Sequence, residues 1–114
     1  FMPWQLAKIS RRAAMGIGNL GGGHQNGSGD IFIAFSTANE NAFSYTKSEL
    51  TMLSDENIDP FFKAAAEAVE EAILNAMCAA ETMKGRNLNT VYALPHDQVR
   101  DILKKYDNIV KAYQ

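Results

Sequence analysis

The sequence predicts an α/β chain, because three helical patterns accompany a short, uninterrupted run of apolar residues. Ile31–Phe35 is apolar at every position, which is typical of a strand buried on both faces, and we expect that strand over residues 30–37. Residues 59–84 repeat apolar side chains at helical spacing. Shorter patterns of the same kind predict helices at residues 3–15 and 95–106.

The first expected helix, residues 3–15, has Pro3 in its first turn and ends at Gly16. A loop is expected over residues 16–29, because six glycines fall in it before Ser28 and few of its side chains could pack. Such a segment is mobile or open to cleavage unless another part of the protein holds it. It leads directly into the apolar strand.

The longest expected helix has a start signal and a stop signal. Asp59 as the N-cap and Pro60 as the first helical residue form a favoured start, and Gly85 favours an end near Lys84. An apolar stripe runs along this helix at Phe62, Ala66, Val69, Ile73, Met77 and Ala80. Further apolar residues beside the stripe indicate packing on more than one side, so some of the helix carboxylates are expected to be partly buried.

The remaining elements are shorter. A turn at residues 39–41 precedes a second expected strand at about 43–53, and residues 86–94 are expected to be extended or loop. The last helix is expected from Pro95 to about Tyr106, with a short tail after it.

The overall composition limits the possible classes of function. The 114 residues allow one small domain, and a net charge of −2 gives no electrostatic case for binding nucleic acid or an anionic membrane. No apolar run approaches the roughly 20 residues of a membrane span.

The one cysteine, Cys78, fits a reducing compartment, so a cytoplasmic location is expected, with the periplasm as the alternative. The helix that opens just after Phe1, without a signal peptide, indicates a piece of a longer protein.

Two familiar site patterns are disfavoured by their context. Gly16–Gly21 matches G-x-G-x-x-G, but a dinucleotide site needs a strand before it and a helix after it, and here that order is reversed. A flexible connector is the favoured interpretation. Neither His24 nor His96 has a partner at metal-ligand spacing, so no metal is expected, and neither gives a positive signal for a Ser-His-Asp triad.

Ser28 is the strongest candidate for chemistry, although most glycine-serine turns are only turns. A serine nucleophile needs a base, and no G-x-S-x-G elbow is present. Cleavage of the Gly27–Ser28 bond would supply one, because the new α-amine of Ser28, with a pKa of about 8, can accept the proton. Gly27 tolerates strained backbone geometry, and Gly29 adds no bulk beside the nucleophile.

Three glutamates on the longest expected helix offer a carboxylate that could assist a nucleophile. Glu67 is expected to be solvated, whereas Glu70 or Glu71, near Leu74, could be buried and could orient a group or relay a proton.

Asn26-Gly27-Ser28-Gly29-Asp30, followed by residues 31–39, closely resembles the processing site of the L-aminopeptidase/D-esterase and β-aminopeptidase family. Three further stretches resemble the same family, at residues 8–16, 70–76 and 93–97. The four motifs stand in the family's order and together extend over nearly the whole chain.

The resemblance implies self-cleavage at Gly27–Ser28. Residues 1–27 would then end the larger α-subunit, and residues 28–114 would form the smaller β-subunit that carries the nucleophile. The implied fold is an α/β four-layer αββα sandwich resembling N-terminal-nucleophile hydrolases, of which this chain is a part. The implied partners are the α-subunit from the same precursor, further copies in an oligomer, and short peptide, amide or ester substrates. No cofactor is implied.

Carried over by position, the resemblance makes Ser28 the nucleophile, with Asn26 and Gly29 in the supporting loop. The family is associated with a serine and a glutamate two positions apart that assist it. Glu70 or Glu71 could be that glutamate, but Ala68 and Val69 stand two positions earlier, so the relay is altered or differently placed. An acyltransferase of the ornithine acetyltransferase type is one alternative, although such enzymes usually use threonine. A non-catalytic assembly subunit is the other, to which Ala68 gives some support.

Overall fold

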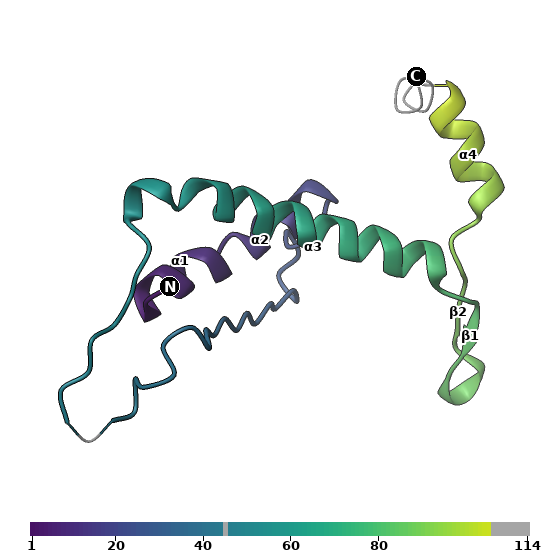
Figure 1. Ribbon diagram of the computed structural model, residues 1–114. Coiled ribbons are helices and arrows are strands. Elements are labelled where there is room, and N and C mark those ends of the chain that lie inside the picture. Colours follow the sequence, from purple (N-terminus) through teal and green to yellow (C-terminus); the bar gives the residue numbers. More distant parts are fainter. Residues whose placement is uncertain (45, 106–114) are drawn as a thin grey trace. The chain divides into compact units, whose positions relative to one another are not determined.

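The computed structural model describes residues 1–44 and 46–105. The helices are α1 (Pro3–Ser10), α2 (Ala13–Asn19), α3 (Asp59–Ala79) and α4 (His96–Lys105), with short 3₁₀ helices η1 (Asp55–Asn57) and η2 (Arg86–Leu88). The strands are β1 (Met83–Lys84) and β2 (Thr90–Val91). The chain divides into two compact units, Phe1–Ala72 and Ile73–Gln114, which are described separately (Figure 1).

In the first unit, α1 and α2 replace the single helix expected over residues 3–15, and the two run alongside the first part of α3 (Figure 1). The expectation that Gly16 ends the helix is wrong. Gly16 is buried inside α2, where its missing side chain lets the helix approach α3 closely. The connector interpretation of the G-x-G-x-x-G stretch is therefore wrong for its first four residues, Gly16–Asn19, which are helical.

The N-terminal part of the chain is anchored by a fully buried amide, that of Gln5. Its Oε1 accepts a hydrogen bond from the backbone N–H of Met2 at 3.0 Å, and its Nε2 donates to the Leu53 carbonyl oxygen and to Asp55 Oδ1, both at 2.7 Å. Lys8 Nζ reaches the other carboxylate oxygen of Asp55 at 3.0 Å. Because every polar atom of the buried amide is satisfied, α1 is fixed against the segment that leads into α3.

The strand expected over residues 30–37 is absent from the described structure. The segment nevertheless keeps the alternation of an extended chain. Ile31, Ile33 and Phe35 are 98%, 87% and 77% exposed, whereas Phe32 and Ala34 are half-buried in a groove beside α1. A strand requires a hydrogen-bonded neighbour, and among the described residues this segment has none.

The second expected strand, at about 43–53, is also absent from the part of the chain that the structure describes. Here the side chain of Asn39, rather than a neighbouring strand, forms hydrogen bonds with the backbone. Asn39 Nδ2 donates to the Thr51 carbonyl oxygen at 3.1 Å, and Asn39 Oδ1 accepts from the Thr51 N–H at 3.0 Å. The amide thus satisfies both backbone groups of Thr51 without forming a ladder.

The expected start of helix α3 is confirmed within one residue, with Pro60 in the first turn. Asp59 is the first helical residue rather than the N-cap. The expected end near Lys84 is wrong. The helix stops at Ala79, and Met83 and Lys84 pair instead with Val91 and Thr90 in an antiparallel hairpin. Backbone pairing across the hairpin, with Gly85 N–H donating to the Asn89 carbonyl oxygen at 2.7 Å, prevails over helical continuation.

In the second unit, the region 86–94 holds the turn and return strand of this hairpin, so the expectation of extended or loop structure is largely confirmed. Helix α4 starts at His96, directly after Pro95, as expected. Its predicted last residue, Tyr106, and the tail lie outside the described residues. No helix within the described ranges is long and apolar enough to cross a membrane.

Candidate functional site

Ser28 lies in an exposed loop after α2. The conformation of the loop depends on its glycines, since Gly21 and Gly23 have φ values of 81° and 79°, which other residues rarely adopt. Ser28 N–H donates to the Gln25 carbonyl oxygen at 2.9 Å and closes a turn. Its Oγ has no hydrogen-bond partner among the described residues, and the hydroxyl is open to solvent.

The residues on either side leave Ser28 accessible. A Cβ added to Gly27 or to Gly29 would meet no atom within 4 Å, and Asn26 is also exposed. A bond in this position can be reached by a neighbouring hydroxyl or by water. The geometry is therefore compatible with cleavage between Gly27 and Ser28.

The three glutamates of α3 differ in their surroundings. Glu67 is exposed and forms an ion pair with Lys63 at 3.5 Å, which confirms the expectation of a solvated side chain. Glu71 is exposed too. Glu70 is half-buried, and its Oε2 accepts a hydrogen bond from Asn19 Nδ2 at 3.0 Å. Of the two glutamates proposed as catalytic, Glu70 is the one whose carboxylate is held in a defined direction.

The crossing of α2 over α3 explains why Asn19 meets Glu70. A Cβ on Gly16 would lie 2.4 Å from the carbonyl oxygen of Ala66 and 3.0 Å from the backbone nitrogen of Glu70 and from the Cβ of Val69. This contact places α2 directly on the turn of α3 that carries Glu70. Asn19 follows Gly16 by three positions and so lies on the same side of α2.

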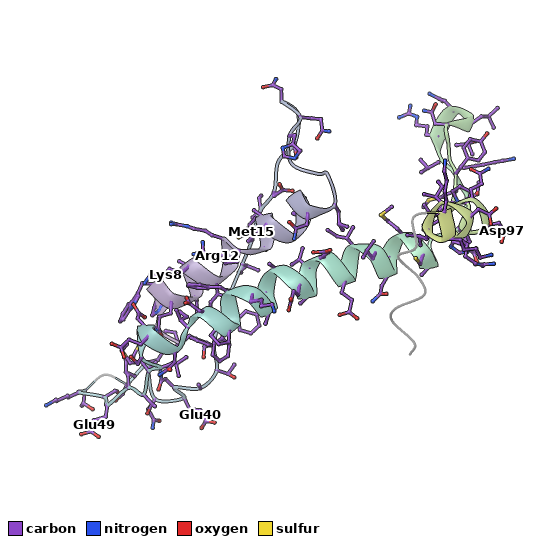
Figure 2. The ribbon with its side chains drawn as sticks, turned by 90° about the horizontal axis from the view of Figure 1, so that it is seen from above. Lys8, Arg12, Met15, Glu40, Glu49 and Asp97 are labelled. Atoms are coloured by element: carbon purple, nitrogen blue, oxygen red, sulfur yellow. The ribbon has the colours of Figure 1, made fainter. Side chains whose placement is uncertain are left out.

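A cation also marks this crossing. The Arg12 guanidinium lies over the Phe62 ring, 4.4 Å from its centroid, and Figure 2 shows Arg12 on the segment that runs alongside α3. The contact joins the α1–α2 connection to the first turns of α3.

The structure does not join the predicted nucleophile to the glutamates that were predicted to assist it. Within the described ranges no hydrogen bond links Ser28 to Glu70 or Glu71. Sequence reasoning missed Asn19 and the buried Gln5. The glycine at position 16 was the available signal for Asn19, since a glycine inside a helical pattern can mark a close helix approach.

The histidines take no part in the site. His24 is exposed in the glycine-rich loop, and His96 is exposed at the start of α4. In the described part of the chain, no three histidine, cysteine or carboxylate side chains gather as metal ligands would.

Comparisons with known proteins point to one family. The profile described as Peptidase family S58 matches residues 1–91. The chain is 43% identical, over 97% of its length, to the β-peptidyl aminopeptidase BapA of Sphingosinicella microcystinivorans. These matches confirm the resemblance to the L-aminopeptidase/D-esterase and β-aminopeptidase family.

Two solved structures resemble the fold. One is the PH0078 protein of Pyrococcus horikoshii, with a TM-score of 0.83 and 46% identity over 90% of the chain. The other is an L-aminopeptidase D-Ala-esterase/amidase of Ochrobactrum anthropi, with a TM-score of 0.85 and 42% identity over 96% of the chain. The second is described as a prototype of the serine aminopeptidases and a variant of the Ntn hydrolase fold, so the expected α/β fold class is confirmed.

The chain spans a minor part of each of these proteins. It accounts for 28% of the length of the Sphingosinicella enzyme and for 29% and 32% of the two solved chains.

Proposed function

The chain belongs to peptidase family S58, and from that membership we propose that it is the nucleophile-bearing part of a serine aminopeptidase that cleaves itself at Gly27–Ser28. The observation that carries the proposal is the exposed Ser28, unhindered between two glycines, in a chain from a family of peptidases.

Self-cleavage needs no group beyond the serine and a proton acceptor. Ser28 Oγ attacks the carbonyl carbon of Gly27, and the peptide C–N bond breaks as the Ser28 nitrogen takes up a proton. The Gly27 acyl group is then held as an ester on Oγ. Water hydrolyses the ester, so that residues 1–27 end in a carboxylate and Ser28 acquires a free α-amine.

The same hydroxyl then acts on substrates. The α-amine of Ser28, with an ordinary pKa of about 8, or a relay through Glu70, removes the proton from Oγ as it attacks the substrate carbonyl. The leaving amine or alcohol takes up that proton as its bond to the carbonyl carbon breaks, and water then releases the acid from the acyl-enzyme. We assign the assisting carboxylate to Glu70 rather than Glu71, because Glu70 is half-buried and held by Asn19.

The substrates proposed are short peptides, amides and esters from which the N-terminal residue is released. The relatives support this class, since one is named a β-peptidyl aminopeptidase and another an L-aminopeptidase D-Ala-esterase/amidase. Residues 1–27 would form the end of the α-subunit and residues 28–114 the β-subunit of one precursor, assembled as oligomers of such pairs.

The two alternatives have less support. The relatives reported above are described as peptidases or esterases rather than acyltransferases, and Ser28 stands where ornithine acetyltransferases usually have threonine. A non-catalytic subunit is still suggested by Ala68 in place of a serine, two positions before Glu70.

The full-length precursor tests the proposal. Mass spectrometry should find a break at Gly27–Ser28, and the protein should hydrolyse aminoacyl p-nitroanilides. Ser28→Ala should abolish both results, whereas Ser36→Ala, which removes another exposed hydroxyl, should abolish neither. An intact chain without hydrolysis would support the non-catalytic subunit. Acetyl transfer from acetylornithine to glutamate would support the acyltransferase.

A further inference from the structure

We propose that Asn19 is a positioning residue whose side-chain amide holds the Glu70 carboxylate in the direction needed to assist Ser28. The inference rests on the proposed function, in which Glu70 is the assisting carboxylate. The two residues are 51 positions apart, and their 3.0 Å contact is the one side-chain hydrogen bond between α2 and α3 recorded for the described residues.

The backbone around the pair defines where the amide can lie. Gly16 sets the distance between α2 and α3, because the position that a Cβ would occupy points at the Ala66 carbonyl oxygen and the Glu70 backbone nitrogen. Asn19 is the last residue of α2, one turn after Gly16. A side chain at this position needs only the short reach of an asparagine to meet Glu70.

The chemistry of an amide suits this role. Asn19 donates an N–H to Glu70 Oε2 without adding a positive charge, so the carboxylate is oriented but not neutralised by an ion pair. The second oxygen, Oε1, has no hydrogen-bond partner within the described residues and stays available to accept a proton. A carboxylate held in one rotamer accepts a proton from a defined direction, which a freely rotating one does not.

The pair also crosses the proposed cleavage site. Asn19 precedes the Gly27–Ser28 bond and Glu70 follows it, so the hydrogen bond joins two polypeptides once the bond is cut. The Gly16 contact and the stacking of Arg12 on Phe62 lie on the same two segments and keep them together. The orientation of Glu70 is therefore expected to persist in the mature enzyme.

Steady-state kinetics of the full-length protein test this role. We expect Asn19→Ala to lower kcat about tenfold with KM changed less than about twofold, because a hydrogen bond to a charged group is lost while substrate contacts remain. Asn19→Asp should lower kcat further by placing a second carboxylate beside Glu70, and Asn19→Gln should restore part of the activity. Asn75→Ala, which removes an exposed amide elsewhere on α3, serves as the matched control.

A double-mutant cycle separates positioning from general stability. If Asn19 acts through Glu70, Asn19→Ala should have little further effect on kcat in a protein that already carries Glu70→Gln. Asn19→Ala should shift the pH profile of kcat only in a protein that retains Glu70. Independent effects in the cycle, or a lower melting temperature with unchanged kcat, would overturn the inference. If hydrolysis did not depend on Ser28, the proposed function would be wrong. If hydrolysis depended on Ser28 but was unchanged by substitution of Asn19, only this inference would be wrong.

Discussion

Gly16 of α2 lies against the backbone of Ala66 in α3, so closely that a Cβ on Gly16 would come within 2.4 Å of the Ala66 carbonyl oxygen. Backbone atoms cannot move away as the tip of a flexible side chain can. The position therefore excludes every residue other than glycine unless the two helices separate.

We predict that Gly16→Ala destabilises the full-length protein by about 1–3 kcal/mol, the usual cost of overpacking. The matched control is Gly18→Ala, in the same helix, where an added Cβ meets no atom within 4 Å. That change should leave stability unchanged or raise it by up to about 1 kcal/mol, because alanine favours a helix. Thermal denaturation of both variants measures the difference, and equal melting temperatures would show that the helices do not touch at Gly16.

The buried amide of Gln5 gives a second prediction. Gln5→Leu should destabilise the protein by about 1–3 kcal/mol, because it leaves the Leu53 carbonyl oxygen without its buried donor. Gln5→Glu should be similarly harmful, since a carboxylate would face Asp55 at the distance of a hydrogen bond. Chemical denaturation measures both, with Gln98→Leu on the exposed surface of α4 as the control. Stability equal to that of the unmodified protein would contradict the proposed anchor.

The carboxylate of Asp55, which bonds to Gln5, makes the stability of the protein depend on pH. Hydrogen bonds from Gln5 and then from Lys8 hold the pKa of Asp55 below its ordinary value of 3.8. A folded-state pKa lower than the unfolded one gives stability that is complete above the unfolded value and is lost as the pH falls through the folded value. The melting temperature should therefore fall more steeply below pH 3.8 than it does in Asp55→Asn, in which position 55 no longer titrates. Parallel curves for the two proteins would show that Asp55 contributes nothing.

The sequence predicts local features of this fold better than pairings between distant segments. Asp59 and Pro60 predict the start of α3 within one residue, because the signal for a helix start lies in residues that are neighbours in the sequence. Gly16 and Gly85 are misread for the opposite reason. One is needed by a helix 50 positions further along the chain and the other by a hairpin, and neither partner is visible in the local pattern.

The candidate site shows the same division. The exposed, unhindered surroundings of Ser28 follow from the glycines beside it. The choice between Glu70 and Glu71 does not, because it depends on which side of α3 meets α2. Helical periodicity limits the candidates for the assisting carboxylate to two adjacent residues, Glu70 and Glu71. The hydrogen bond with Asn19 then distinguishes Glu70 from Glu71.

The apolar segment 31–35 gives a prediction about the whole protein. Phe32 and Ala34 are half-buried beside α1, whereas Ile31, Ile33 and Phe35 are largely exposed in this chain, which is about a third of the length of the solved relatives or less. An extended segment with an apolar outer face is expected to gain a neighbouring strand from the remainder of the full-length protein. The amides of residues 31–35 should then be protected in hydrogen exchange, whereas those of residues 22–27 should exchange quickly. Rapid exchange throughout would show that no strand forms.

The α-amine of Ser28 gives the last prediction, since it is the base that self-cleavage would create. If that amine removes the proton from Oγ, kcat/KM should rise as the pH passes through about 8, because only the neutral amine is a base. Carbamylation of the mature enzyme at its new N-terminus should abolish hydrolysis, because a carbamylated nitrogen no longer accepts the proton. The control is a precursor treated with cyanate before it cleaves, in which the Ser28 nitrogen is still a peptide nitrogen and escapes the reagent. Enzyme that matures after that treatment should be fully active, and a mature enzyme that stays active when carbamylated would assign the role of base to Glu70 instead.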